Sequence, residues 1–178
     1  MNSFQYFQLK KDEKLTNPIQ IFRFTVEGEY TGGKVIDPRI VPKHQVAYFE
    51  YSPQVELCHV LFQPTLLVEN SIKRPWHLYE PRIKYKGVQV FANDTQINVS
   101  PMYWCPVLDS IDCMDKQTEL YPDGKLKNLV IHFKAIQGRH IIQVAGLLEP
   151  TVLVSLQVAE SMLKRSAIGF ELQEVMLV

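Results

Sequence analysis

The last 28 residues carry the clearest hydrophobic pattern in the chain. Residues 151–154 form an apolar run that is typical of a buried strand. After Ser155, apolar side chains recur at helical spacing, and the predicted buried face consists of Val158, Ala159, Met162 and Leu163. Gly169 then indicates a turn before a second short strand. The pattern predicts a strand–helix–strand unit, with Ser155 as the N-cap of the helix.

A similar pattern occurs about 80 residues earlier. Residues 65–68 predict a strand, residues 71–79 a short helix, and residues 82–91 a second strand. Asn70 or Ser71 is the expected N-cap, because either side chain can accept a hydrogen bond from an unpaired backbone N–H group.

The two segments align with each other. Thr65 and the three residues after it match Thr151 and its three successors, and Gly87 falls opposite Gly169. This alignment indicates a degenerate internal repeat and two pseudo-symmetric halves. Two ordinary strand–helix–strand units can also resemble each other by chance, and the sequence leaves that alternative open.

The remaining segments favour strands and loops. Strands are expected at residues 4–10, 19–26, 45–51, 56–63, 127–134 and 140–147, and the last two are expected to pair as a hairpin around Gly138. Residues 27–42 are rich in Gly and Pro and predict a loop, with a β-turn at residues 31–34.

The fold class expected from these elements is α+β. It has a mostly antiparallel or mixed β-sheet and two short helices in pseudo-repeated strand–helix–strand units. We expect one domain over residues 1–178, with a β-rich N-terminal part at 1–59 and the remainder at 60–178.

Composition narrows the function classes. Hydrophobic residues make up 46% of the chain and charged residues 21%, which is typical of a folded domain. The 19 basic and 19 acidic residues give a formal net charge of zero, which argues against a general nucleic-acid binder. The start of the chain has no signal-peptide pattern, and no apolar run is long enough to span a membrane.

The three cysteines are an odd number without metal-type spacing. We expect Cys58, Cys105 and Cys113 to be buried, reduced thiols, and we expect the protein to be cytoplasmic.

Motifs for catalysis are missing from the sequence. There is no phosphate-binding loop, no dinucleotide fingerprint, no G-x-S-x-G and no H-E-x-x-H. His132 and His140 would face each other if the predicted hairpin formed, but strand histidines are more often structural than metal ligands. We therefore expect no catalytic residues, no metal, no cofactor and no enzymatic activity.

An acidic segment follows Cys105. It contains one basic residue, Lys116, and five acidic ones: Asp109, Asp112, Asp115, Glu119 and Asp123. These carboxylates fit a solvated loop, and they also fit a patch that attracts a basic partner by long-range electrostatics. They are the expected partner-binding residues.

Two other groups of residues are weaker candidates. Trp76, Tyr103 and Trp104 could anchor a partner, although Trp104 lies in an apolar run. A basic cluster could contact phosphate or could protect strand edges; it consists of Lys73, Arg74, Arg82, Lys84 and Lys86.

Three stretches carry a family resemblance: residues 103–114, residues 143–150, and residues 152–165 together with 169–172. In these stretches the chain resembles immunity-protein family eleven of bacterial polymorphic-toxin systems, formerly catalogued as a domain of unknown function. The resemblance covers roughly residues 60–178, and its motifs are scaffold residues. It implies a cytoplasmic protein that binds and neutralises a cognate toxin. Members of such families match their own toxins on variable surfaces, so no residue role is carried over.

Two other hypotheses stay open at this point. A small-molecule-binding domain or enzyme could use a cleft between the two repeated units, and it would show a deep pocket with convergent polar groups. A structural assembly subunit would show an obligate oligomer with a large apolar interface. The sequence does not indicate the oligomeric state.

Overall fold

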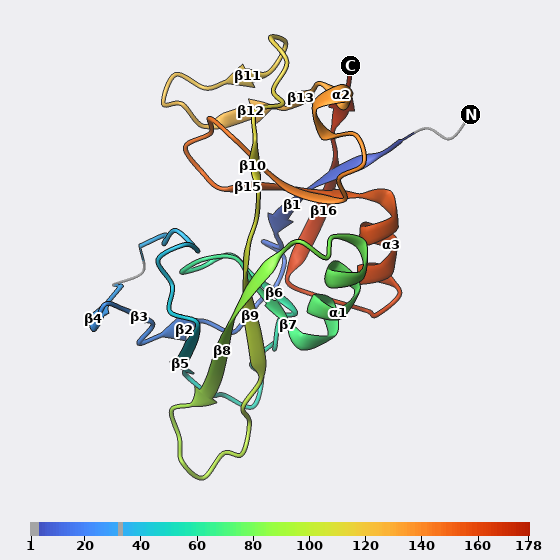
Figure 1. The fold of residues 1–178 in the computed structure, drawn as a ribbon. Coiled ribbons are helices and arrows are strands. Elements are labelled where there is room, and N and C mark those ends of the chain that lie inside the picture. Colours follow the sequence, from blue (N-terminus) through green and yellow to red (C-terminus); the bar gives the residue numbers. More distant parts are fainter. Residues whose placement is uncertain (1–3, 32–33) are drawn as a thin grey trace.

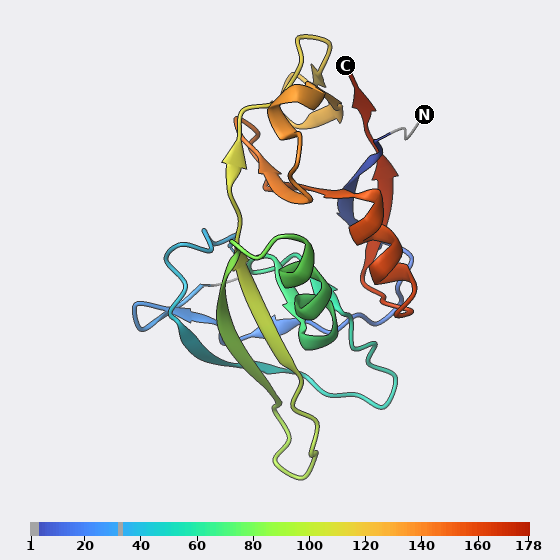
Figure 2. The same ribbon diagram turned by 45° about the vertical axis from the view of Figure 1, so that its right-hand side comes forward.

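The computed structural model describes residues 4–31 and 34–178, so the β-turn expected at residues 31–34 lies partly outside the described residues. The protein has the predicted α+β fold, and its described residues form two main β-sheets and three short helices (Figures 1 and 2).

One sheet contains six strands and forms the lower half of the molecule in Figure 1. In spatial order these are β2 (Ile21–Phe22), β5 (His44–Phe49), β8 (Lys84–Ala92), β9 (Met102–Val107), β7 (Leu67–Glu69) and β6 (Val60–Leu61). The pair β5–β8 is parallel and the other pairs are antiparallel. The sheet is therefore mixed, as the sequence predicts.

The other sheet contains five strands. In spatial order these are β10 (Ser110–Ile111), β14 (Ile141–Val144), β15 (Thr151–Ser155), β1 (Tyr6–Lys11) and β16 (Phe170–Glu174). The N-terminal strand β1 lies between β15 and β16 and is antiparallel to both. Residues 6–11 thus complete a sheet whose other strands come from residues 110–174.

Three two-stranded ladders complete the β-structure. They are β3 (Thr25–Val26) with β4 (Glu29–Tyr30), β11 (Glu119–Leu120) with β12 (Leu126–Asn128), and β13 (Val130–Ile131) with β17 (Met176–Leu177). The β11–β12 hairpin lies at the end of the molecule far from the six-stranded sheet (Figure 1).

Both predicted strand–helix–strand units are present. In the first, α1 (Asn70–Tyr79) connects β7 and β8; in the second, α3 (Leu156–Leu163) connects β15 and β16. In each unit the two strands are antiparallel to one strand inserted between them, which is β9 in the first unit and β1 in the second. The two halves therefore share a local topology.

The helix caps differ from the sequence prediction. Ser155 is the N-cap residue of α3 as expected, but its side chain makes no capping hydrogen bond. The N-cap of α1 is Glu69, whose carboxylate accepts a hydrogen bond from the Ser71 backbone N–H group, so the choice of Asn70 or Ser71 was wrong. The Asn70 side chain instead accepts a hydrogen bond from the Trp104 indole at 3.1 Å.

Helices α1 and α3 lie side by side and connect the two halves through a shared core (Figures 1 and 2). Ile72 and Trp76 of α1 and Val158 and Met162 of α3 are completely buried there and pack with Leu9 of β1 and other apolar residues of both sheets. Full burial of such side chains contributes about 1.5–3 kcal/mol each, so this middle layer is a principal source of cohesion between the halves. Leu163, which was predicted on the buried face of α3, is 58% exposed, so that part of the prediction was wrong.

The strand predicted at residues 19–26 is divided into β2 and β3, the strand predicted at residues 56–63 is reduced to β6, and the predicted hairpin was wrong. Residues 127–134 and 140–147 do not form a hairpin, because α2 (Phe133–Ile136), a third helix, interrupts them. Strand β13 pairs with β17 and strand β14 pairs with β15. The short helical turn buries Ile136 completely against the five-stranded sheet, and this burial outweighs the local strand pattern.

Candidate partner-binding surface and polar contacts

The β11–β12 hairpin presents apolar side chains to solvent. Leu120 is 47% exposed and Tyr121 is 52% exposed, although both follow directly on the acidic Glu119. Leu148, on the loop after β14, is 72% exposed and packs on Gly124 at the hairpin turn. Tyr121 and Leu148 line the same hollow of about 210 Å³. We call Leu120, Tyr121 and Leu148 the hairpin patch.

The hairpin turn is held by its own backbone. The Tyr121 N–H group donates to the Lys125 carbonyl at 2.8 Å, and the Gly124 N–H group donates to the Tyr121 carbonyl at 2.9 Å. Gly124 has a φ of 81°, a conformation that glycine adopts without strain, as the sequence Tyr-Pro-Asp-Gly predicts. The aromatic ring of Tyr121 is therefore carried by a defined turn.

The acidic residues of the hairpin have basic neighbours. Glu119 lies 2.8 Å from the Lys127 ammonium on the paired strand, and Asp123 lies 3.7 Å from the ammonium of Lys125. Because both pairs are exposed, each contributes little to stability, typically below about 1 kcal/mol. The hairpin patch is thus bordered by charges of both signs.

The other three predicted acidic residues lie apart from the hairpin patch. Asp109 forms an ion pair with Arg139 at 2.7 Å. Asp115 lies 2.9 Å from His132 Nε2 and accepts a hydrogen bond from the Gln117 backbone N–H group. That backbone bond and the nearby His132 hold the pKa of Asp115 below its usual range.

Asp112 is exposed. It has no ion-pair partner within the part of the chain that the structure describes. Four of the five predicted acidic residues therefore lie in separate local pairs along the segment, and only Asp112 is left without an ion pair among the described residues, so the segment is not one uniformly negative surface.

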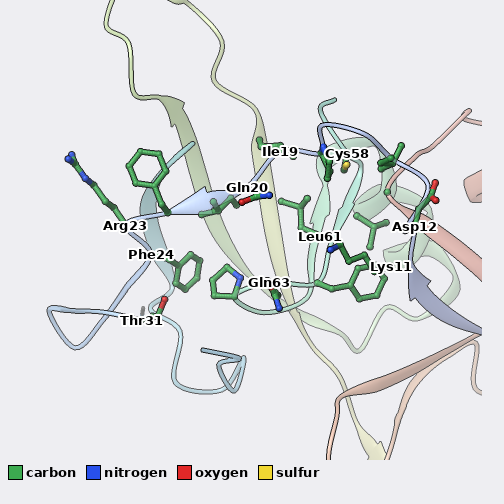
Figure 3. A pocket seen from close by; sticks show the side chains of 18 of the residues that line it. Lys11, Asp12, Ile19, Gln20, Arg23, Phe24, Thr31, Cys58, Leu61 and Gln63 are labelled. Atoms are coloured by element: carbon green, nitrogen blue, oxygen red, sulfur yellow. The ribbon is translucent and has the colours of Figure 1, made fainter. Parts of the chain in front are cut away.

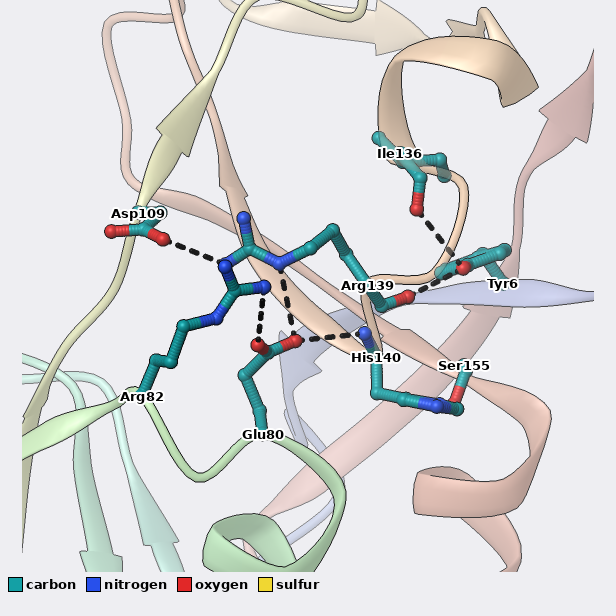
Figure 4. A network of polar contacts seen from close by, with 8 residues as sticks. All are labelled: Tyr6, Glu80, Arg82, Asp109, Ile136, Arg139, His140 and Ser155. Carbon is teal, nitrogen blue, oxygen red and sulfur yellow. Dashed lines mark hydrogen bonds and ion pairs between the residues drawn. The ribbon is translucent and has the colours of Figure 1, made fainter.

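A polar network joins the two halves beside the shared core (Figure 4). Its centre is Glu80, whose carboxylate is only 4% exposed. One oxygen of Glu80 accepts from Arg139 Nε at 3.3 Å and from the His140 backbone N–H group at 3.0 Å, while the other lies 3.5 Å from Arg82. Glu80 ends α1 in the first half, and Arg139 precedes β14 in the second.

The Arg139 backbone is fixed from the opposite side. Its carbonyl accepts a hydrogen bond from the Tyr6 hydroxyl at 2.5 Å, and burial raises the pKa of Tyr6, so this hydroxyl stays a donor. A buried carboxylate costs several kcal/mol of desolvation unless it is paired and hydrogen-bonded, as Glu80 is. We interpret this network as a structural connection between the halves.

His140 and Ser155 form a close pair next to the same network. His140 Nδ1 lies 2.9 Å from Ser155 Oγ, and Ser155 is 3% exposed. A hydrolytic triad would need a carboxylate on the remaining ring nitrogen of the histidine. Glu80 bonds the His140 backbone N–H group instead, and the Ser155 hydroxyl is enclosed. This geometry fits a buried structural contact.

His132 and His140 are not brought together. His132 contacts Asp115, whereas His140 contacts Ser155, because α2 separates the two histidines. Within residues 4–31 and 34–178 there is no cluster of three or more His, Cys, Asp or Glu side chains that could hold a metal ion.

The three cysteines are free and buried, as the sequence predicts. Burial raises the pKa of Cys105 and of Cys113 to about 11, and it also raises the pKa of Cys58. A thiol is a weak nucleophile in its protonated form, so all three environments disfavour reactivity near neutral pH.

Two of the three aromatic anchor candidates belong to the core. Trp76 is fully buried, and Tyr103 is 1% exposed with its hydroxyl bonded to the Cys58 carbonyl at 2.6 Å. Trp104 is half-buried and carries the Lys73 ammonium 3.3 Å from its ring centroid. The hairpin patch is not among the residues predicted from the sequence, although the apolar pair Leu120 and Tyr121 after Glu119, in an otherwise polar turn, indicates it.

The basic cluster is also partly engaged within the protein. Lys73 stacks on Trp104, Lys86 donates to the Arg39 carbonyl at 2.6 Å, and Arg82 pairs with Glu80. Three of the five basic side chains are therefore held by contacts within the protein.

A groove of about 510 Å³ lies between the two halves. It is walled by Leu9 and Val152 of the five-stranded sheet and by Leu66 and Leu108 of the segments that face it. Lys11 also lines it. A groove in this position is what the alternative hypothesis of a ligand site between the two repeated units expects.

No protein-family model matches the chain, and no curated protein matches it either. The resemblance to immunity-protein family eleven therefore depends on the sequence stretches that carry it. Among the residues that the structure describes, no helix has the length and apolar character needed to cross a bilayer.

Proposed function

We propose that this protein binds a cognate toxin protein and neutralises it by direct contact, as a cytoplasmic immunity protein without catalytic activity. The resemblance to family eleven supports the class. The observation that carries a binding role is the hairpin patch, in which Leu120 and Tyr121 of the β11–β12 hairpin and Leu148 of the loop after β14 are exposed.

The hairpin patch has the features of a protein interface. Tyrosine is enriched at binding hot spots because it combines a large apolar area with a hydroxyl group and few rotatable bonds. The backbone hydrogen bonds of the turn hold Tyr121 in place before binding, which lowers the entropy cost of association. Exposed apolar groups surrounded by charges are typical of a surface that a partner covers.

The bordering charges supply specificity in this proposal. Glu119 and Asp123 lie at the hairpin, and a partner with basic side chains would compete with Lys127 and Lys125 for them. Charges at the rim of an interface mainly raise the association rate and select the partner. Asp112 is the acidic residue of the segment that a partner can engage without breaking an ion pair among the described residues. Asp109 and Asp115 would have to leave Arg139 and His132.

The test is co-purification with the product of the adjacent gene, followed by calorimetric measurement of the complex and a toxicity assay. Tyr121→Ala and Leu148→Ser are each expected to weaken binding by about 30-fold or more, since a hot-spot truncation costs about 2 kcal/mol or more. Leu78→Ser is the matched control, because Leu78 is 81% exposed on α1, far from the hairpin. Asp112→Lys is expected to slow association, with a smaller effect at high salt.

The hairpin patch and the immunity class are contradicted by different results. A tight complex that is indifferent to the Tyr121 and Leu148 substitutions would discard the hairpin patch and leave the immunity class intact. The absence of any complex with a neighbouring gene product would sink the immunity proposal itself.

The groove between the halves supports a second candidate function. Its volume of about 510 Å³ lies within the range of roughly 300–1,000 Å³ that is common for small-molecule sites. A small-molecule-binding domain or an enzyme would therefore use this groove. A ligand that raises the melting temperature of the wild-type protein, but not of a Leu108→Trp variant, would favour this candidate.

A further inference from the structure

A separate cavity of about 480 Å³ lies between the N-terminal part of the chain and strand β6 (Figure 3). It is distant in the fold from the hairpin patch, and no proposal above assigns it a role. Its walls come from the end of β1, from residues 18–24, and from the segment around β6. The volume is again in the range of small-molecule sites.

The body of the cavity is apolar. Ile19, Phe24 and Leu61 are at most 7% exposed and present their side chains to it. The base is formed by tightly packed backbone at Gly169, where a β-carbon would lie 2.5 Å from the Val60 carbonyl oxygen. An apolar ligand would thus meet preformed walls, and little ordering would be needed on binding.

The charged groups at the rim differ in whether they are free to contact a ligand. The Arg23 side chain extends away from the cavity in Figure 3, and its guanidinium lies over Phe22 and Tyr48, 5.6 and 5.9 Å from the ring centroids. Asp12 accepts a hydrogen bond from the Lys14 backbone N–H group at 2.9 Å and so caps a local turn.

Lys11 remains available to a ligand. It lies beside Leu61 in Figure 3, and among the described residues its ammonium has one distant carboxylate neighbour, Glu13, at 3.9 Å. An ammonium at the end of an apolar cavity favours a ligand that carries one negative charge next to an apolar body.

We propose that this cavity binds an apolar molecule with a single carboxylate. The carboxylate lies at Lys11, and the apolar body packs against Phe24 and Leu61. This site is independent of toxin binding, because the hairpin patch shares no residue with it.

The experiment is titration calorimetry of the full chain with octanoate, decanoate and dodecanoate below their micelle concentrations. Burial of each added CH₂ is worth about 0.8 kcal/mol, which corresponds to about four-fold tighter binding per carbon. Dodecanol tests the charge, because it has the same alkyl chain without a carboxylate and is expected to bind more weakly than dodecanoate.

Two substitutions locate the site. Lys11→Met is expected to weaken dodecanoate binding by up to about five-fold, the scale of an exposed ion pair, and to leave dodecanol binding unchanged. Lys10→Met is the matched control, because Lys10 is the neighbouring lysine on β1 and does not line this cavity. Gln20→Trp fills the cavity from an exposed position and is expected to abolish binding with little effect on folding.

Three results would overturn the proposal. The first is no saturable binding of any of the three carboxylates. The second is equal binding of dodecanol and dodecanoate together with an indifferent Lys11→Met variant, which would remove the carboxylate assignment. The third is full binding by a folded Gln20→Trp variant, which would place the ligand elsewhere, for instance in the groove that Lys11 also lines.

Discussion

The indole nitrogen of Trp76 lies 3.4 Å from the sulfur of Met162 in the middle layer of the protein. Trp76 is the seventh residue of α1, and Met162 is the seventh residue of α3. The alignment of Thr65 with Thr151 makes the two positions equivalent. The halves therefore meet at matching residues, which is the arrangement expected when two related units pack around a pseudo-two-fold axis.

This contact is expected to dominate the stability of the shared core. Trp76→Ala should lower the free energy of unfolding by about 3–5 kcal/mol, and Met162→Ala by about 2–5 kcal/mol, because each leaves a cavity. The double variant should lose less than the sum of the two, since the residues touch. Urea unfolding measures all three, with Leu163→Ala, at a neighbouring position that is 58% exposed, as the control. Strict additivity of the two losses would contradict direct coupling.

The buried Glu80 is expected to hold the halves together through Arg139 and the His140 backbone. Glu80→Ala removes one partner of a buried ion pair and should cost about 3–5 kcal/mol in the free energy of unfolding. Glu160→Ala, at an exposed position of α3, should lower the free energy of unfolding by less than about 0.5 kcal/mol. Chemical denaturation of both variants provides the comparison. A Glu80 variant as stable as the wild type would mean that solvent compensates for the lost carboxylate.

Local periodicity is what made much of the fold predictable. The strand–helix–strand units are continuous in sequence, so the alternation of buried and exposed positions around Ile72 and Val158 indicates them directly. The insertion of β1 between β15 and β16 depends on pairing between the two ends of the chain, for example Leu9 with Leu172. No local pattern specifies that partner. The same limitation produced the incorrect hairpin at residues 127–147.

The candidate site was only partly visible in the sequence. The acidic residues could be found by composition, but their pairing with Arg139, His132 and Lys127 is set by tertiary structure. Exposure is also a property of the folded chain: Trp76 and Tyr121 are both aromatic residues, yet one is fully buried and the other is half exposed.

The lowered pKa of Asp115 predicts a pH dependence of stability. A carboxyl group with a lower pKa in the folded state stabilises the protein above its unfolded pKa of about 3.9. That contribution is lost as the pH falls below this value and through the folded pKa. Asp115→Asn should therefore reduce the difference between the urea midpoints at pH 6 and at pH 2.5. Asp112→Asn, an exposed neighbour, is the control, and an equal change in both variants would argue against the Asp115 contacts.

Thiol reactivity provides a direct check on the three buried cysteines. Cys105 and Cys113 have pKa values of about 11, against an ordinary value of 9.0, so their thiolate fraction at pH 8 is lowered by about 100-fold. Burial restricts the access of reagents as well. Native protein should react very slowly with a disulfide reagent at pH 8, whereas protein in concentrated urea should release the signal of all three thiols.

Cys58 is the thiol most open to reagents, because it lines the N-terminal cavity. If one thiol reacts rapidly in the native state, mass spectrometry of the labelled peptide identifies it. A labelled Cys58 that dodecanoate protects would connect access to this thiol with occupancy of the cavity, whereas rapid labelling of Cys105 or Cys113 would contradict the packing of the two main sheets.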